Sequence, residues 1–168
     1  DKYMLEIYAK TAFKNYQLSS IGLRFFNVYG PRQDPTNPYS GVISIFVDRL
    51  LRSDKIIING GYQTRDFIYV NDVVEAIYKS VVLAKNTVVC EQINILTGKS
   101  VSIDELATML MKKIAVNVEK EYSILPAGDP EGSEGTTEKM ENLLNIDLND
   151  MISIDIGLSE TVKFIGGG

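Results

Sequence analysis

Apolar side chains recur along the chain with two periods, and together they predict alternating helices and strands. Spacings of three and four residues from Met4 to Tyr16 are typical of a helix, whereas short apolar runs between turn residues are typical of strands. Helices are predicted over 2–16, 41–51, 73–83, 102–114, 136–144 and 158–165. Strands are predicted over 20–26, 56–58, 67–70, 92–96 and 121–125. This alternation indicates an α/β fold with mostly parallel strands.

Local signals refine some of these boundaries. The strand over 20–26 is apolar except for Arg24, so we expect it to be buried on both faces. Asn71 or Asp72 is the expected cap of the helix that begins near residue 73. Ser102, followed three residues later by Glu105, predicts a capping box at the start of the next helix.

The length and charge of the chain limit its organisation and its partners. We expect 168 residues to form a single unit over 1–168, in which 166–168 are frayed or foreign to the natural sequence. A net charge of −5 and a pI near 4.8 argue against a nucleic-acid surface. No apolar run approaches the length needed to cross a bilayer, and no secretory signal opens the chain. We therefore expect neither nucleic acid nor membrane as a partner, and a cytoplasmic location.

The sequence contains no histidine and only one cysteine, Cys90. An internal disulfide and a cysteine-rich zinc site are therefore excluded, as are Ser-His and Cys-His nucleophile pairs. Any chemistry must depend on carboxylates, lysine, tyrosine, hydroxyl groups or a cofactor. A glycine-rich strand-to-helix turn that could hold a pyrophosphate is also missing from the sequence.

The stretch over 22–35, GLRFFNVYGPRQDP, begins as a strand and breaks into a polar loop. Ligands of open α/β sheets bind at the carboxyl ends of strands, which makes this loop the first candidate for a site. Asn27 can present its amide to a polar ligand there, while Gly30 and Pro31 fix a tight turn. The alternative is a purely structural loop in which Asn27 hydrogen-bonds its own backbone.

Two further residues are candidates for binding an anionic ligand. Asn59 ends a predicted strand, and Arg65 is expected in the loop just before the strand over 67–70. A guanidinium group at such a position can bind a diphosphate through two parallel hydrogen bonds. The alternative for Arg65 is a surface ion pair with Asp66. Asp129 and Ser133 lie in an acidic loop, where capping of the following helix is the simpler interpretation.

Four segments resemble, in order and spacing, the C-terminal part of a known family. They are GLRFFNVYGPRQDP, IIINGGYQTRDFIYVNDVVEAI, INILTGKSVSIDELA and AGDPEGSEGTTEKMENLL. The family is that of the NAD-dependent nucleotide-sugar epimerases and dehydratases, the extended short-chain dehydrogenases/reductases, and the likeness is greatest to UDP-glucose and UDP-N-acetylglucosamine 4-epimerases. The resemblance implies a partial Rossmann-like fold: the substrate-binding part with the last elements of the Rossmann core, and the N-terminal NAD-binding half missing.

The resemblance also implies roles for individual residues. The first ten residues resemble the helix of the family's Tyr-x-x-x-Lys motif, in which Lys2 is the lysine and the tyrosine falls before residue 1. Lys2 would bind the nicotinamide ribose and lower the pKa of that tyrosine, which removes a proton from the sugar. The matching cofactor contacts are Lys2, Phe26, Val28 and Tyr29. The matching substrate contacts are Asn27, Gly41, Val42, Asn59, Arg65 and Ser133.

The chain departs from the family pattern at one phosphate contact. Pro126 stands where a second diphosphate-binding arginine is usual, so we expect a neighbour such as Lys120 to compensate if the clamp is kept. The loop before Arg65 is also about one residue shorter than the family pattern.

The activity implied is NAD-dependent 4-epimerisation of a UDP-hexose or UDP-N-acetylhexosamine through a 4-keto sugar. A nucleotide-sugar 4,6-dehydratase or reductase is the near alternative, and a non-catalytic nucleotide-sugar-binding module is the distant one. No metal is implied. We expect the 168 residues alone to be inactive, and the full protein to be a homodimer formed through the helix over 2–16.

Overall fold

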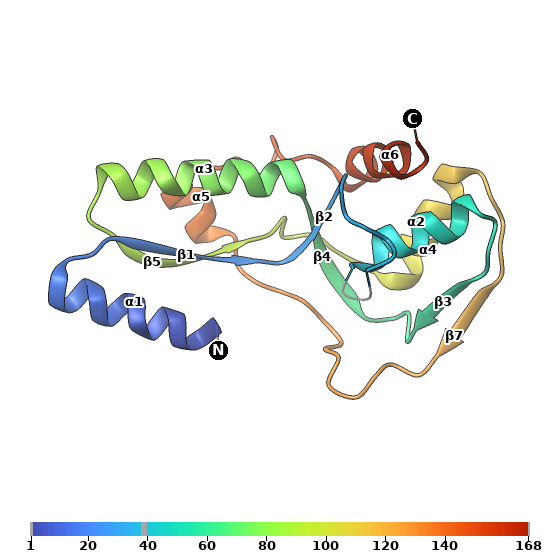
Figure 1. Ribbon diagram of the computed structural model, residues 1–168, viewed down its shortest axis with the longest axis horizontal. Helices are drawn as coiled ribbons and strands as arrows, with labels where there is room; N and C mark the ends of the chain where they lie inside the picture. The colour runs from blue at the N-terminus through green and yellow to red at the C-terminus, as the bar shows by residue number, and fades with distance from the viewer. Residues whose placement is uncertain (1, 38–39, 168) are drawn as a thin grey trace.

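The computed structural model describes residues 2–37 and 40–167. It is elongated, with two regions that meet at a central sheet of three strands (Figure 1). The elements at one end are α1 (Lys2–Tyr16), β1 (Ser20–Phe25), α3 (Val70–Asn86), β5 (Cys90–Ile95) and α5 (Glu138–Leu144). Those at the other end are α2 (Val42–Leu51), β3 (Ile56–Asn59), α4 (Ile103–Ile114), β7 (Lys120–Ser123) and α6 (Ile154–Ile165). Between them lie β2 (Asn27–Tyr29), β4 (Thr64–Tyr69) and β6 (Ser100–Ser102).

Parallel pairing dominates, as the sequence predicted. β1 pairs with β5 from Ser20 opposite Cys90 to Phe25 opposite Ile95. β2 pairs in parallel with β4, and β3 in parallel with β7. The antiparallel pair of β4 with β6 was not predicted, because the three residues of β6 have no apolar run to mark them.

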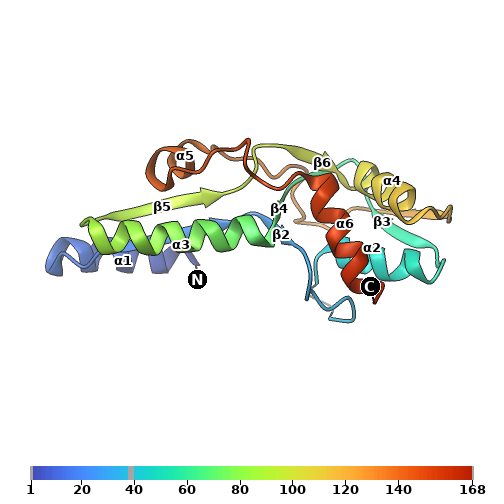
Figure 2. The ribbon, with the colours of Figure 1, turned by 90° about the horizontal axis from the view of Figure 1, so that it is seen from above.

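Two apolar clusters lie on opposite sides of β4. Successive side chains of a strand point to opposite faces, so Phe67 and Tyr69 enter one cluster and Ile68 enters the other. The first cluster joins α2, α4, α6 and β3; the second joins α3, α5 and β5. Viewed from above, α6 lies beside α2 and α4, whereas α3 runs along β1 and β5 (Figure 2). β4 therefore contributes side chains to both clusters and carries polar groups at its ends.

Several predicted boundaries were wrong at strand and helix ends. β1 contains no buried residue, and Phe25 is 46% exposed, so the expectation of burial on both faces fails. α3 begins at Val70 without a side-chain cap. Asp72 lies in its first turn and accepts hydrogen bonds from the Ile152 amide at 3.2 and 3.3 Å. Burial raises the pKa of Asp72, an effect that the Ile152 hydrogen bond opposes.

The predicted capping box at the start of α4 was confirmed. The Ser102 hydroxyl accepts from the Glu105 amide at 3.1 Å, and the Glu105 carboxylate accepts from the Ser102 amide at 2.9 Å.

α6 begins at residue 154, four residues before its predicted start, because Ser153 caps it. At the end of α6 the Gly166 amide donates to the Val162 carbonyl and the Gly167 amide to the Phe164 carbonyl. Residue 168 lies outside the described part of the chain. None of the described helices is long and apolar enough to span a bilayer.

Candidate functional site: a polar cavity where β2, β3, β4 and α2 meet

A cavity of about 430 Å³ opens where β2, β3, β4 and the start of α2 converge. This volume falls within the range of small-molecule sites. Seven of the ten residues implied by the resemblance line it or adjoin its wall: Asn27, Val28, Tyr29, Gly41, Val42, Asn59 and Arg65. Further lining residues are Gln33, Ile43, Phe46, Ile57, Gln63, Phe67, Ile103 and Asp129. Asn59 is the last residue of β3, whereas Asn27 is the first residue of β2 and Arg65 the second of β4, so the cavity lies at the end of one strand and the starts of two others.

Asn27 is fixed by a neighbouring strand rather than by its own backbone. Its Nδ2 donates to the carbonyl oxygen of Asp66 in β4 at 2.9 Å. The expected bond of Asn27 to its own backbone is therefore wrong, while its role as a ligand contact stays a prediction. Because the amide nitrogen is engaged, Oδ1 is the atom left to accept a hydrogen bond from a ligand.

The loop after β2 turns sharply and delivers the chain to α2. Gly30 has φ of +148°, and a Cβ there would lie 2.6 Å from Cγ1 of Val70. Only glycine fits this position. Gly41 then takes the N-cap position of the ten-residue helix α2 with no side-chain cap, and Gly41, Val42 and Ile43 line the cavity. A helix start of this kind favours a negatively charged ligand group.

Asn59 is held by a turn that Gln63 organises. The buried Gln63 accepts from the Gly61 amide at 2.6 Å and donates to the Asn59 carbonyl at 2.5 Å. The Asn59 side chain is exposed, and its Oδ1 accepts from the Ser123 hydroxyl at 2.6 Å. The Asn59 Nδ2 group is therefore the donor that this residue can offer to a ligand.

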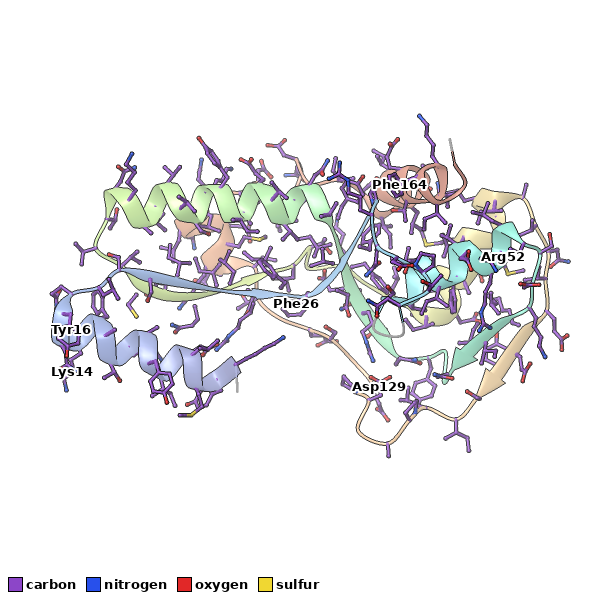
Figure 3. All side chains as sticks on the ribbon, viewed as in Figure 1. Lys14, Tyr16, Phe26, Arg52, Asp129 and Phe164 are labelled. Carbon is purple, nitrogen blue, oxygen red and sulfur yellow. The ribbon has the colours of Figure 1, made fainter. Side chains whose placement is uncertain are left out.

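Arg65 lies within β4, not in the loop that was predicted. Its side chain is 12% exposed, Nη1 donates to the Thr64 carbonyl at 2.8 Å, and Nη2 donates to Asp129 Oδ1 at 3.0 Å. The alternative of an ion pair between Arg65 and Asp66 is wrong. The buried Asp66 carboxylate instead accepts hydrogen bonds from the hydroxyl and the backbone amide of Thr97, both at 2.9 Å. Asp129 enters the site from the loop between β7 and α5 and does not cap α5 (Figure 3).

Tyr29 is buried, and Phe26 is half-buried. The Tyr29 ring is buried and makes edge contacts with Phe67 and Tyr69, at centroid distances of 6.3 and 5.6 Å. Burial raises the pKa of its phenol above the usual range. Phe26, at the end of β1 (Figure 3), lies against the later loop so closely that a Cβ at Gly135 would approach its ring to 2.7 Å.

Lys2 and Ser133 lie outside the 430 Å³ cavity. Lys2 is exposed on α1 and lines a separate cavity of about 560 Å³ between α1 and β1. Among the described residues it makes no ion pair. Ser133 is half-buried, and its carbonyl accepts from the Ser100 hydroxyl of β6 at 3.2 Å. The structure therefore separates these two predicted site residues from the group around Arg65.

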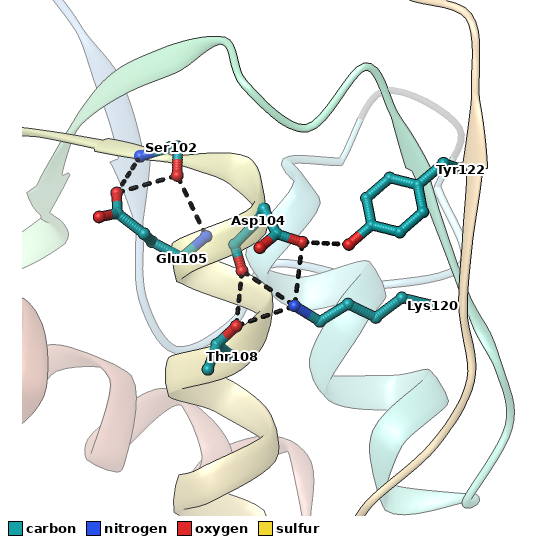
Figure 4. A network of polar contacts seen from close by, with 6 residues as sticks. All are labelled: Ser102, Asp104, Glu105, Thr108, Lys120 and Tyr122. Atoms are coloured by element: carbon teal, nitrogen blue, oxygen red, sulfur yellow. Dashed lines mark hydrogen bonds and ion pairs between the residues drawn. The ribbon is translucent and has the colours of Figure 1, made fainter.

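Lys120 does not replace the second diphosphate-binding arginine. Its ammonium group donates to Asp104 Oδ1 at 2.9 Å and to Thr108 Oγ1 at 2.8 Å, both on α4 (Figure 4). The Tyr122 hydroxyl donates to the same Asp104 oxygen. Both partners hold the pKa of Asp104 below its usual range, Tyr122 with the larger effect. Lys120 thus ties β7 to α4 instead of facing the cavity.

The comparisons with known proteins agree with this geometry. Residues 1–95, more than half of the chain, match the NAD dependent epimerase/dehydratase family. The chain belongs to this family. The UDP-glucose 4-epimerase of Mycolicibacterium smegmatis is 30% identical over 161 residues, which are 95% of this chain and 49% of that protein. The chain thus spans about half the length of this curated relative.

Solved structures of epimerases share the fold of this family member. The UDP-glucose 4-epimerase of Thermotoga maritima, determined with UDP-glucose, gives a TM-score of 0.87 at 34% identity over 96% of this chain and 50% of that one. The UDP-N-acetylglucosamine 4-epimerase of Methanobrevibacter ruminantium, in complex with UDP-N-acetylmuramic acid, gives 0.86 at 31% identity over 96% and 51%. The expected partial Rossmann-like α/β fold is confirmed.

The residues present fit the family's NAD cofactor in part. Lys2 is exposed and forms no ion pair with the described residues, so it is available to a nicotinamide ribose. Val28 and Tyr29 both line the separate 430 Å³ cavity, and the Tyr29 ring is largely buried. Within the described ranges, no group of three or more Cys, His, Asp or Glu residues could hold a metal ion.

Sequence reasoning missed two glutamines of the site. Gln63 belongs to a quoted motif, but nothing local shows that its amide would close the turn after β3. Gln33 also lies in a quoted motif, and its Oε1 is buried without a hydrogen-bond partner among the described residues. Its position two residues after the predicted tight turn at Gly30 and Pro31 is the only sequence signal that points to Gln33.

Proposed function

We propose that this chain forms the nucleotide-sugar-binding part of an NAD-dependent enzyme that epimerises a UDP-hexose or UDP-N-acetylhexosamine at C4. The observation that carries the proposal is the convergence of Arg65, Asn59 and the uncapped start of α2 on one cavity. These groups supply a guanidinium fork, an amide donor and helix amides, all of which suit a diphosphate. The names of the relatives support the epimerase and the UDP group.

The proposal assigns a role to each of the site residues. Arg65 and the start of α2 hold the diphosphate, and Asn59 donates to the nucleotide. Asn27, whose nitrogen is fixed by β4, accepts from a sugar hydroxyl through Oδ1. When bound, NAD supplies the acceptor and donor of the hydride that leaves and returns to C4. Lys2 binds the nicotinamide ribose and stabilises the deprotonated form of a neighbouring phenol by its charge.

The geometry of Arg65 makes the proposal testable by binding alone. Arg65→Ala removes a nearly buried cation that can form two charge-assisted hydrogen bonds, so we expect UDP affinity to fall by about 10- to 100-fold in a calorimetric titration. Arg65→Lys keeps the charge but not the fork, and an intermediate loss is expected.

The matched control is Arg24→Ala. Arg24 is also paired with a carboxylate, Glu6, at 2.7 Å, but it lies in β1 away from the cavity. UDP affinity should not change in this variant. If Arg65→Ala binds UDP as tightly as the unchanged protein, with an unchanged melting temperature, the assignment of the diphosphate site is wrong.

A further inference from the structure

Gln63 lines the same cavity as Asn59 and Arg65, yet its polar atoms are bonded within the protein. The residue is only 4% exposed. Its Oε1 accepts from the Gly61 amide at 2.6 Å, and its Nε2 donates to the Asn59 carbonyl at 2.5 Å. Both ends of the carboxamide are thus engaged in the turn over 59–63, so Gln63 acts on a ligand through the residues that it holds.

The turn over 59–63 needs such a support because two glycines follow Asn59. Gly60 and Gly61 have φ of +73° and +102°, conformations that glycine adopts at little steric cost but with a large loss of backbone freedom. A Cβ at Gly60 would lie 2.7 Å from Gln63 Oε1, so the glycine also leaves the room that the carboxamide occupies. The two hydrogen bonds of Gln63 therefore restrict a segment that its glycines would otherwise leave flexible.

The backbone of the turn is anchored from a second side, by α4. The Asp104 amide donates to the Gly61 carbonyl at 3.0 Å, and the Ile103 amide donates to the Gln63 carbonyl at 3.2 Å. These bonds join main-chain atoms only, so a change of the Gln63 side chain leaves their donors and acceptors in place. What such a change removes is the hold on the Asn59 carbonyl at the end of β3.

The Asn59 side chain is the group that this hold directs. Its Oδ1 accepts from the Ser123 hydroxyl at 2.6 Å, which leaves Nδ2 as the donor to a ligand. Arg65 is oriented instead by the Thr64 carbonyl, 2.8 Å from Nη1. Gln63 therefore holds the residue assigned to the nucleotide rather than the residue assigned to the diphosphate.

We propose that Gln63 is a positioning residue for nucleotide binding, whose carboxamide fixes the end of β3 so that Asn59 Nδ2 faces an acceptor atom of the nucleotide. The inference rests on the proposed function, which assigns Asn59 to the nucleotide and Arg65 to the diphosphate. It adds a residue that strengthens binding without touching the ligand, because a group that is already held in place loses less freedom when the ligand binds.

Gln63→Met tests the inference, because methionine has a similar length but cannot donate to the Asn59 carbonyl. UDP affinity is measured by calorimetric titration for Gln63→Met, Asn59→Ala and the double variant, at a temperature well below their melting temperatures. Asn59→Ala loses one hydrogen bond to the ligand, so we expect its affinity to fall by about three- to tenfold. Gln63→Met should lose about threefold, and no more than Asn59→Ala, because it acts through Asn59.

A double-mutant cycle distinguishes this positioning role from a general structural one. Gln63→Met should cause no further loss of UDP affinity in the Asn59→Ala background. In the Arg65→Ala background it should cause the same loss as in the unchanged protein. A general destabilisation would lower the melting temperature in every background and would produce no such coupling between Gln63 and Asn59.

Two further variants complete the experiment. Gln92→Met makes the same change at a half-buried glutamine of β5 and should leave UDP affinity unchanged. Gln63→Glu keeps an acceptor for the Gly61 amide and loses the donor to the Asn59 carbonyl, so it takes the place of Gln63→Met in the cycle if that variant does not fold.

Different results would overturn the inference at different points. Unchanged UDP affinity of Gln63→Met, or an equal loss with and without the Asn59 side chain, would refute the role of Gln63 while leaving the proposed function intact. Unchanged affinity of Asn59→Ala, together with the expected loss in Arg65→Ala, would remove the contact through which Gln63 acts and keep the diphosphate site. A failure of the unchanged protein to bind UDP would refute the proposed function, and the inference with it.

Discussion

Asp129 and a bound diphosphate would both bind the same guanidinium group, that of Arg65. Nη2 of Arg65 lies 3.0 Å from Asp129 Oδ1, and the Asp129 side chain is 42% exposed. Nη1 is already oriented by the Thr64 carbonyl at 2.8 Å, so Arg65 does not depend on Asp129 for its direction. The carboxylate is therefore a competitor that a diphosphate must displace.

We expect Asp129→Asn to bind UDP more tightly, by up to about fivefold, because a partly exposed ion pair contributes about 0.2 to 1 kcal/mol. The affinity is measured by calorimetric titration at low salt, where such a pair counts most. Glu131→Gln in the same loop removes one negative charge without touching Arg65 and should have a smaller effect. Weaker binding by Asp129→Asn would instead make Asp129 the group that orients Arg65.

Hydrogen bonds between β7 and α4 fix the position of β7. Two side chains of β7 donate to the Asp104 carboxylate, Lys120 at 2.9 Å and the Tyr122 hydroxyl, and the Lys120 ammonium also donates to Thr108 Oγ1 (Figure 4). β7 is paired only with β3 among the described strands. The edge of β7 that faces away from β3 is therefore held largely by this network. The chain then continues from β7 into the loop that carries Asp129.

Asp104→Asn should lower the free energy of unfolding at pH 7 by about 0.5 to 1 kcal/mol, since the pair is partly screened by solvent. The pKa of Asp104 is lowered in the fold. Its contribution is thus present above the unfolded value near 3.8 and is lost as the pH falls through the lower folded value. Urea unfolding from pH 7 to pH 2 should show the two proteins converging at acid pH.

Asp48→Asn is the control for this measurement, because Asp48 is paired at 2.8 Å with Arg52, four residues further along the chain, and not with another element. A difference between Asp104→Asn and the unchanged protein that persists at pH 2 would contradict an electrostatic role for Asp104.

How far the sequence predicts an element depends on whether its signals are local. The capping box of Ser102 and Glu105 was correct because both partners lie within four residues. The short β6 and the extension of β4 over Arg65 were missed, because those residues become strands only through pairing with each other. The same applies to Arg65 and Asp129, which are 64 residues apart and meet only in the fold.

Residue roles inferred from the resemblance divide in the same way. Positions on β2, β3, β4 and α2 converge on one cavity. The ring of Tyr29 fills the space beside α6, where a Cβ at Gly157 would lie 2.2 Å from its hydroxyl oxygen, so its role as a cofactor contact stays a prediction. Whether a side chain turns to the cavity or to the core is decided by such packing, which the spacing of a motif does not contain.

At the scale of the whole molecule, two helices present apolar faces to solvent. α1 has no buried residue, and Tyr3, Leu5 and Tyr8 are 69%, 68% and 62% exposed. On α3 a second apolar stripe includes Tyr78 and Val81, which are 64% and 61% exposed. Exposed apolar faces of this kind are typical of contacts with other protein surfaces. The predicted homodimer assigns α1, but not α3, to the contact between two copies.

Tyr8→Glu separates the two faces, because it places a charge at the centre of the α1 surface. We expect the unchanged protein to sediment as a dimer in analytical ultracentrifugation, and Tyr8→Glu to shift the equilibrium toward monomer by at least tenfold, since a buried unpaired carboxylate is strongly unfavourable at an interface. Tyr78→Glu makes the same change at an equally exposed tyrosine of α3 and should leave the equilibrium as it is. The reverse pattern would place the interface on α3, and a monomer at all concentrations would rule out the dimer.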